Sequence, residues 1–310
     1  PYVVPIALGV LCALFLMQRQ GTAAVGALFG PVCLVWFLAL AAVGLWSILA
    51  HPAVLAALDP RHAWRFITSH GFASFAVLGA VVLAFTGVEA LYADMGHFGK
   101  KPIRLAWFWF VFPCLLLNYF GQGALVLRLP SAVENPFYLL APRAMLYPLI
   151  AIATAAVIIA SQALISGAFS LTQQCVQLGY SPRMTIVHTS AREAGQIFIP
   201  EINNALMVSC ILVVIGFKNS SALGAAYGIA VTGTMAITTL LFVVVAAARW
   251  NWPRWQALTL AAAFLVMDVA FLGANVLKIG HGGWVPLVVA ISLFVLMTTW
   301  KRGRAILRER

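Results

Sequence analysis

Residues 71–96 read GFASFAVLGAVVLAFTGVEALYADMG, an apolar run of bilayer length with an acidic residue, Glu89, well inside it. An ionisable side chain at the centre of a lipid-facing helix costs about 2.5–3.5 kcal/mol on insertion scales. Glu89 is therefore expected to face a protein interior or a water-filled path. Gly87 lies between Thr86 and Glu89 and permits a helix break, and broken helices at membrane depth line cavities. We therefore expect an interruption around residues 86–89 with a functional role.

The composition of the whole chain is that of an integral membrane protein. Its 310 residues are 63% hydrophobic and only 9% charged, and the mean hydropathy is +0.98. A soluble domain of this length needs far more polar surface. Runs near the roughly 20 residues that cross a bilayer predict an all-α, polytopic bundle with nine spans and a transmembrane domain over residues 1–300: 2–17, 24–49, 71–96, 103–127, 147–172, 199–217, 221–248, 256–277 and 284–300.

The basic residues predict the orientation of these spans, because Lys and Arg are retained on the cytoplasmic side of a membrane. The segments that follow the odd-numbered spans hold 13 of the 19 basic residues, and the opposite segments hold 6. This asymmetry predicts a cytoplasmic C-terminus, with residues 301–310 as the start of a cytoplasmic region, and an external Pro1. An external first residue fits a chain whose preceding spans, odd in number, are missing.

The charge pattern and the spacing of reactive residues disfavour several function classes. The net charge of +11 comes from basic residues scattered at helix ends, which fits membrane topology and lipid headgroups better than nucleic acid. The five cysteines lie singly, and the six histidines form no metal-binding spacing. No nucleophile elbow, catalytic triad spacing or phosphate-binding glycine loop is present in the sequence. We expect no enzyme activity, no cofactor and no metal other than a transported ion.

Other polar residues inside the expected spans are few. Tyr227 is the one large polar side chain in a run of small residues, and Asp268 is a second deeply placed acid. Asn118 and Gln122 form an i, i+4 pair, and Ser166 lies on a polar side of the fifth span. For Asp268, Asn118, Gln122 and Ser166, hydrogen bonding between helices is favoured over a role in a transport pathway. For Tyr227 the two interpretations are evenly balanced.

Five segments of the chain resemble the KUP/HAK/KT potassium uptake permeases. The longest is residues 86–99, TGVEALYADMGHFG, and the others are NYFGQGA at 118–124, HTS at 188–190, GQIFIP at 195–200 and AYGIAVT at 226–232. The likeness extends from the first span to the last.

That resemblance implies a fold and an activity. Members of the family have twelve membrane helices on the LeuT-like inverted-repeat plan of the amino acid–polyamine–organocation (APC) superfamily. They carry K+ inward, in bacteria together with H+. The nine spans then correspond to helices four to twelve, so that the chain is truncated at the N-terminus. Part of the ion site and a C-terminal cytosolic domain would lie outside it.

The same resemblance assigns roles to individual residues. Thr86 and Tyr227 match positions that contribute oxygens to bound K+, and Glu89 matches the acid of proton coupling. The implied mechanism is K+/H+ symport by alternating access in the cell membrane, the bacterial inner membrane being the expected location. The expected partners are K+, H+ and membrane lipids. For the oligomeric state, a homodimer is one option. The alternative function is an organic-cation or amino-acid permease of the same superfamily.

Overall fold

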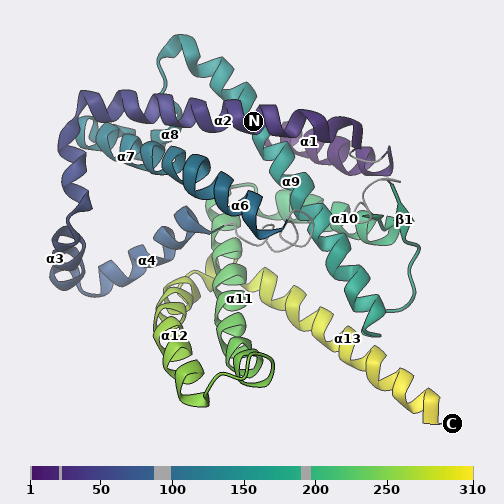
Figure 1. Ribbon diagram of the computed structural model, residues 1–310. Helices are drawn as coiled ribbons and strands as arrows, with labels where there is room; N and C mark the ends of the chain where they lie inside the picture. Colours follow the sequence, from purple (N-terminus) through teal and green to yellow (C-terminus); the bar gives the residue numbers. More distant parts are fainter. Residues whose placement is uncertain (1, 21–22, 87–98, 190–196, 310) are drawn as a thin grey trace.

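The computed structural model describes residues 2–20, 23–86, 99–189 and 197–309. It is almost entirely helical (Figure 1). In chain order the long helices are α1 (Val3–Met17), α2 (Ala23–Ala50), α4 (Phe72–Phe85), α7 (Phe112–Arg128), α9 (Leu146–Gln177), α10 (Pro200–Phe217), α11 (Ser220–Ala248), α12 (Arg254–Val276) and α13 (Trp284–Glu309). Shorter helices are α3 (Pro60–His70), α6 (Lys100–Ala106) and α8 (Pro136–Leu139), with a π-helical turn at Trp107–Val111 that joins α6 to α7.

Short helical turns and one small strand pair connect these elements. The 3₁₀ turns are η1 (Gln18–Gln20), η2 (Pro52–Leu58), η4 (Pro130–Glu134), η5 (Arg143–Met145) and η6 (Ile279–His281). The strands β1 (Val187–His188) and β2 (Ile197–Phe198) pair antiparallel between α9 and α10.

Among the described residues, seven helices are long and apolar enough to cross a membrane, and α1 and α4 are shorter apolar helices. Their apolar side chains extend round the whole helix surface. On α13 no residue is buried, and Leu293, Phe294 and Val295 are consecutive and exposed. A helix that is apolar on every side suits lipid better than water. The polytopic helical bundle expected from composition is therefore confirmed, whereas the inverted-repeat plan stays a prediction.

Two observed helices differ from the expected spans. Helix α13 continues to Glu309, beyond the expected end of the ninth span at residue 300. Helix α3 lies in a segment that we expected to be a loop. Asp59 accepts a hydrogen bond from the Arg61 N–H and Pro60 occupies the first turn, which is a standard helix start. Its residues are all exposed, so hydropathy alone gives no sign of it.

Helices α2 and α7 lie side by side and cross closely. A Cβ atom on Gly44 would lie 2.3 Å from the Leu117 carbonyl oxygen, and one on Gly121 would lie 2.4 Å from the Gly44 Cα. Only glycine at both positions allows the two backbones to touch. Small residues play this part in membrane proteins because packing, with little hydrophobic driving force, holds helices together in lipid.

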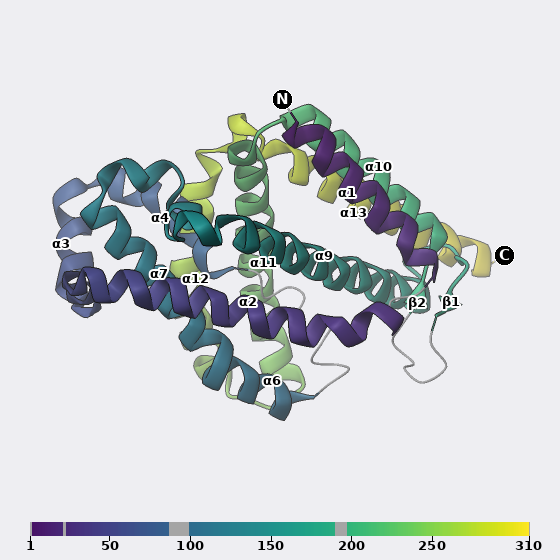
Figure 2. The ribbon, with the colours of Figure 1, turned by 90° about the horizontal axis from the view of Figure 1, so that it is seen from above.

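A second contact region joins α1, α9 and α10, with α1 and α10 side by side in Figure 2. Leu14, Phe15, Phe169 and Phe198 form part of its buried apolar cluster. Two buried polar contacts bracket that cluster. The Gln18 Nε2 donates to the Gln162 Oε1 at 2.6 Å, and the Asn203 Nδ2 donates to the Phe15 carbonyl at 3.2 Å.

The third group is α4, α11 and α12; Tyr227 lies on α11, Asp268 lies on α12, and Thr86 directly follows α4. Helices α11 and α12 form an antiparallel pair, and α4 packs against both (Figure 1). The contact of α4 with α12 is close, since a Cβ on Gly79 would lie 3.1 Å from the Ala274 carbonyl oxygen. On α11, Gly228 accommodates the fully buried side chain of Asn275 from α12.

Candidate functional site: the end of helix α4

Helix α4 ends at Phe85, at the position where the sequence predicts an interruption. Thr86 is extended, with φ −90° and ψ 170°. Ending a helix here leaves carbonyl groups of its last turn without intrahelical partners. One of them is satisfied from outside, because the Tyr119 hydroxyl of α7 donates to the Ala84 carbonyl. The interruption therefore has a fixed contact to a neighbouring helix. Gly87 and Glu89 lie outside the described residues.

The Thr86 hydroxyl oxygen is buried and has no hydrogen-bond partner among the described residues. A buried hydroxyl without a partner loses about 1–3 kcal/mol of hydrogen-bonding free energy. Such oxygens are expected to meet water, an ion or another polar group in the working protein. Thr86 Oγ1 is thus available as a ligand at the point where the helix stops.

Tyr227 lies on α11, the helix next to the end of α4. The two helices meet at Leu83, whose Cδ1 would be 3.6 Å from a Cβ on Gly224. Thr86 follows Leu83 by three residues, and Tyr227 follows Gly224 by three residues. The Tyr227 side chain is 40% exposed. The fold therefore brings the segments that carry Thr86 and Tyr227 together at one helix contact.

Asp268 has a structural partner. Its side chain is buried on α12, and its Oδ2 accepts a hydrogen bond of 2.5 Å from the Thr239 hydroxyl of α11. This contact lies well away along α11 from Tyr227, twelve residues earlier in the chain. Asp268 thus links α11 to α12 through a side-chain hydrogen bond. This contact is separate from the end of α4 that carries Thr86.

The remaining candidates are spread over other helices. Asn118 is buried on α7 next to the Gly44 crossing, and its Oδ1 has no partner among the described residues. Gln122 is partly buried one turn further along α7, and Ser166 is exposed on α9. Among the described residues, no contact joins Ser166 to the end of α4.

Three residues that the sequence analysis did not single out lie near this site. Tyr119 holds the last turn of α4, Asn275 packs on Gly228, and Lys278 reaches α4 at Gly79. Asn275 carries the same signal as Asn118, a polar residue inside an apolar span. Within the described residues, no group of His, Cys, Asp or Glu could hold a metal ion.

Comparison with known proteins decides the family. The family model described as the K+ potassium transporter integral membrane domain matches residues 1–305. The chain belongs to this potassium transporter family. It is therefore a multi-pass membrane protein of a transporter family, and the resemblance noted from the signature segments is confirmed.

Individual relatives agree with the family assignment. The chain is 60% identical over 310 residues to a probable potassium transport system protein Kup 2 of Cupriavidus necator, covering all of this chain and 49% of the relative. It is 60% identical over 303 residues to a probable Kup protein of Anaeromyxobacter sp., covering 98% and 46% of the two chains. It is 59% identical to a probable Kup protein of Myxococcus xanthus over 310 residues, again all of this chain and 48% of the relative. The chain thus spans about half the length of these curated relatives.

The Asp268–Thr239 contact gives a prediction about stability. Asp268→Asn removes the charge, and Thr239→Val removes the donor while keeping the side-chain shape. Both changes are expected to lower the amount of folded protein, by about 1–3 kcal/mol of stability for the lost donor. The K+ concentration that gives half-maximal uptake should stay within about threefold of wild type. Thermal unfolding and uptake by the same two full-length variants check this. A changed K+ affinity at wild-type stability would indicate that Asp268 belongs to the transport site.

Proposed function

We propose that the full-length protein carries K+ into the cell as a K+/H+ symporter that works by alternating access. One observation supports this most strongly. Helix α4 stops at Phe85, and the buried Thr86 hydroxyl beyond it has no described partner. K+ is a weakly hydrated cation that prefers neutral hydroxyl and carbonyl oxygens, and interrupted helices supply both.

In this proposal Thr86 and Tyr227 each contribute an oxygen to bound K+, and Glu89 couples the ion to a proton. Carboxyl and hydroxyl groups near one another allow the binding of K+ and of H+ to influence each other. The membrane potential then drives uptake, with about 2.3 kcal/mol per translocated charge for every 100 mV.

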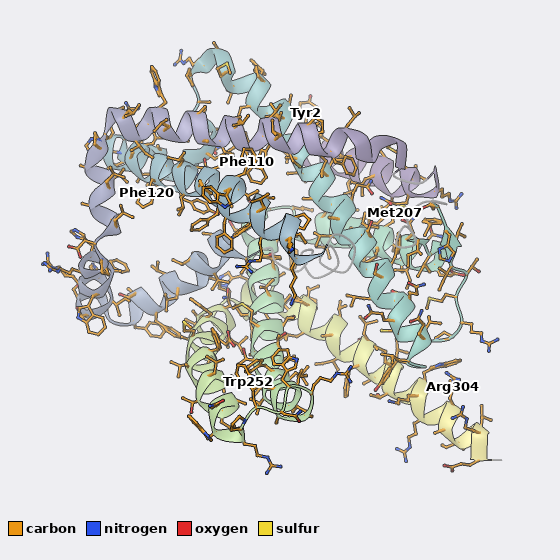
Figure 3. All side chains as sticks on the ribbon, in the orientation of Figure 1. Tyr2, Phe110, Phe120, Met207, Trp252 and Arg304 are labelled. Atoms are coloured by element: carbon orange, nitrogen blue, oxygen red, sulfur yellow. The ribbon has the colours of Figure 1, made fainter. Side chains whose placement is uncertain are left out.

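Contacts at the far end of α13 fit the expectation that two of the basic segments lie on one side of the membrane. The Lys301 Nζ donates to the Tyr180 hydroxyl at 2.6 Å and lies 4.0 Å from the centre of that ring. The guanidinium of Arg304, labelled in Figure 3, approaches Gly179. These contacts hold the segment after α9 against the end of α13. Both are segments that the charge asymmetry assigns to the cytoplasm.

The experiment is uptake of Rb+, as a K+ substitute, into cells that lack their own K+ uptake systems and express the full-length protein. We expect saturable uptake that excess K+ inhibits, that amino acids and organic cations leave unchanged, and that collapse of the proton gradient reduces. Inhibition by an amino acid or organic cation instead of K+ would favour the alternative permease function, which the family match does not favour. Uptake that is insensitive to the proton gradient would remove the symport part of the proposal.

A further inference from the structure

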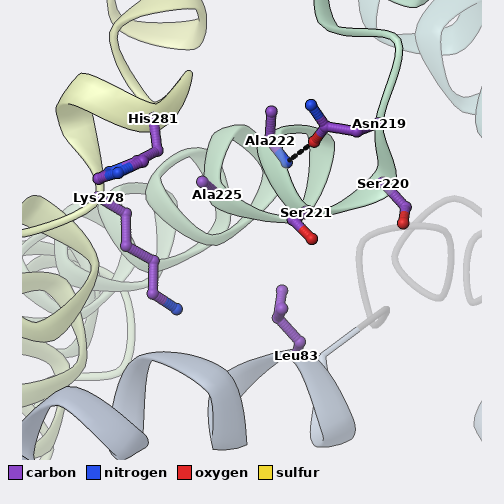
Figure 4. Close-up of a pocket in the computed structure, with 9 residues that line it drawn as sticks. Leu83, Asn219, Ser220, Ser221, Ala222, Ala225, Lys278 and His281 are labelled. Carbon is purple, nitrogen blue, oxygen red and sulfur yellow. Dashed lines mark hydrogen bonds between the residues drawn. The ribbon is translucent and has the colours of Figure 1, made fainter. Parts of the chain in front are cut away.

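A pocket of about 730 Å³ lies between α4, the start of α11 and the α12–α13 connection (Figure 4). Leu83 contributes from α4, Asn219, Ser220 and Ser221 from the start of α11, and Lys278 and His281 from the connection. The Asn219 side chain accepts a hydrogen bond from the Ala222 N–H and so caps α11. The rest of the polar lining is hydroxyl groups and two basic side chains.

Lys278 is the charged residue of this lining. It is partly buried, and Figure 4 shows its side chain extending from the α12–α13 connection toward α4. Its Nζ would lie 3.2 Å from a Cβ on Gly79, near the middle of that helix. The one salt bridge among the described residues joins Arg61 to Asp59, so no described carboxylate pairs with Lys278. Among the residues that the structure describes, the positive charge in this pocket is therefore not paired with a carboxylate.

The pocket leads toward the proposed ion site. Leu83 and Gly224, which adjoin each other, both line it; Leu83 precedes Thr86 by three residues and Gly224 precedes Tyr227 by three residues. Its other lining segments, the α10–α11 and α12–α13 connections, are those that the charge asymmetry assigns to the outside. A cation that reaches the end of α4 from outside through this pocket passes the Lys278 ammonium.

We propose that Lys278 sets the apparent affinity for external K+ by keeping this outer pocket electropositive. The proposal rests on the proposed function. Two like charges repel strongly across a few ångströms of partly buried space, and salt screens the repulsion over about 8 Å at physiological ionic strength. The ammonium thus lowers the occupancy of the pocket by K+ and shifts uptake to higher external K+. The charge of Lys278 acts on K+ on its way to the ligands, so Lys278 tunes the apparent affinity and is not itself a ligand.

A graded charge series in the full-length protein tests this. Lys278→Arg keeps the charge, Lys278→Gln removes it and Lys278→Glu reverses it. We expect the Rb+ concentration for half-maximal uptake to be unchanged in the first variant, to fall by about 3- to 30-fold in the second and to fall further in the third. These differences should shrink when ionic strength is raised with the chloride salt of a bulky, non-transported cation. External pH is held constant throughout the series.

The matched control is Lys218→Gln. Lys218 is exposed at the end of α10, next to the pocket residue Asn219, but it does not line the pocket. The same loss of charge there should leave the half-saturating concentration unchanged. An equal shift in this control would show that general surface charge, and not the pocket, is responsible.

A structural role for Lys278 predicts a different result. The maximal rate would then follow the amount of protein in the membrane, and the half-saturating concentration would not move in Lys278→Gln or Lys278→Glu, which would overturn the proposal. If those variants do not accumulate, Lys278→Cys treated from outside with cationic or neutral thiol reagents provides the same comparison, with the unmodified chain as the control for its own cysteines. We expect only the cationic reagent to raise the half-saturating concentration. Absence of Rb+ uptake by the wild type would instead contradict the proposed function itself.

Discussion

Tyr227→Phe in the full-length protein is expected to raise the K+ concentration for half-maximal uptake by about 5- to 150-fold. The change removes one hydroxyl and keeps the ring, so packing of the side chain against its neighbours on α11 is preserved. Loss of one ion ligand, or of the hydrogen bond that orients it, corresponds to about 1–3 kcal/mol of binding free energy. Saturation curves of Rb+ uptake measure the effect directly.

The control for this change is Tyr147→Phe. Tyr147 is 79% exposed at the start of α9, so the same loss of a hydroxyl should leave K+ affinity unaltered. If Tyr227→Phe reduces only the amount of protein in the membrane, its hydroxyl serves helix packing and does not bind K+. The even balance that the sequence leaves for Tyr227 would then be decided in favour of structure.

Glu89→Gln is expected to abolish or flatten the pH dependence of K+ uptake. Glutamine keeps the size and hydrogen bonding of the side chain but cannot exchange a proton, so coupling through this position is lost. The protein should still fold, because a neutral side chain at membrane depth is less costly than an ionisable one. Rb+ uptake measured across external pH provides the comparison with wild type.

Glu201→Gln is the matched change for this experiment. Glu201 is exposed in the first turn of α10, and its loss should leave the pH profile as it is. A wild-type pH profile in Glu89→Gln would assign proton coupling to another residue of the full-length protein.

The membrane class and the helix break were both predictable from the sequence, for reasons that are local in the chain. Apolar runs of bilayer length are a property of consecutive residues, and they give the helical bundle. Thr86, Gly87 and Glu89 form a polar interruption in one such run, and α4 indeed ends at Phe85. The start signal of α3 at Asp59 and Pro60 was also local. An exposed helix such as α3 has no long apolar run, however, so the hydropathy pattern does not predict it.

Contacts between distant residues were not predictable in this way. The hydrogen bond from Gln18 to Gln162 joins residues 144 positions apart, and the glycine crossing pairs Gly44 with Gly121. No periodicity in either helix specifies which glycine meets which. For Asp268 the sequence favoured a structural role over a transport role, and its partner Thr239 could be found only from the packing of α11 on α12.

Lys278 illustrates the same limit for the candidate site. In the sequence it is one of the basic residues that flank helix ends, and the charge count uses it only to orient the chain. In the structure its side chain reaches α4 at Gly79, and it lines a pocket. A side chain of four methylene groups can reach well beyond its own backbone position, so its place in the site follows from the fold alone.

A pair of variants at Thr86 tests whether its hydroxyl is a K+ ligand. Thr86→Val removes the hydroxyl and keeps the branched shape, whereas Thr86→Ser keeps the hydroxyl and removes the methyl group. The measurement is the Rb+ concentration for half-maximal uptake by the full-length protein in cells without other K+ uptake. We expect Thr86→Ser to stay within about threefold of wild type and Thr86→Val to rise by about 5- to 150-fold. Wild-type affinity in Thr86→Val would show that the Thr86 hydroxyl does not bind K+.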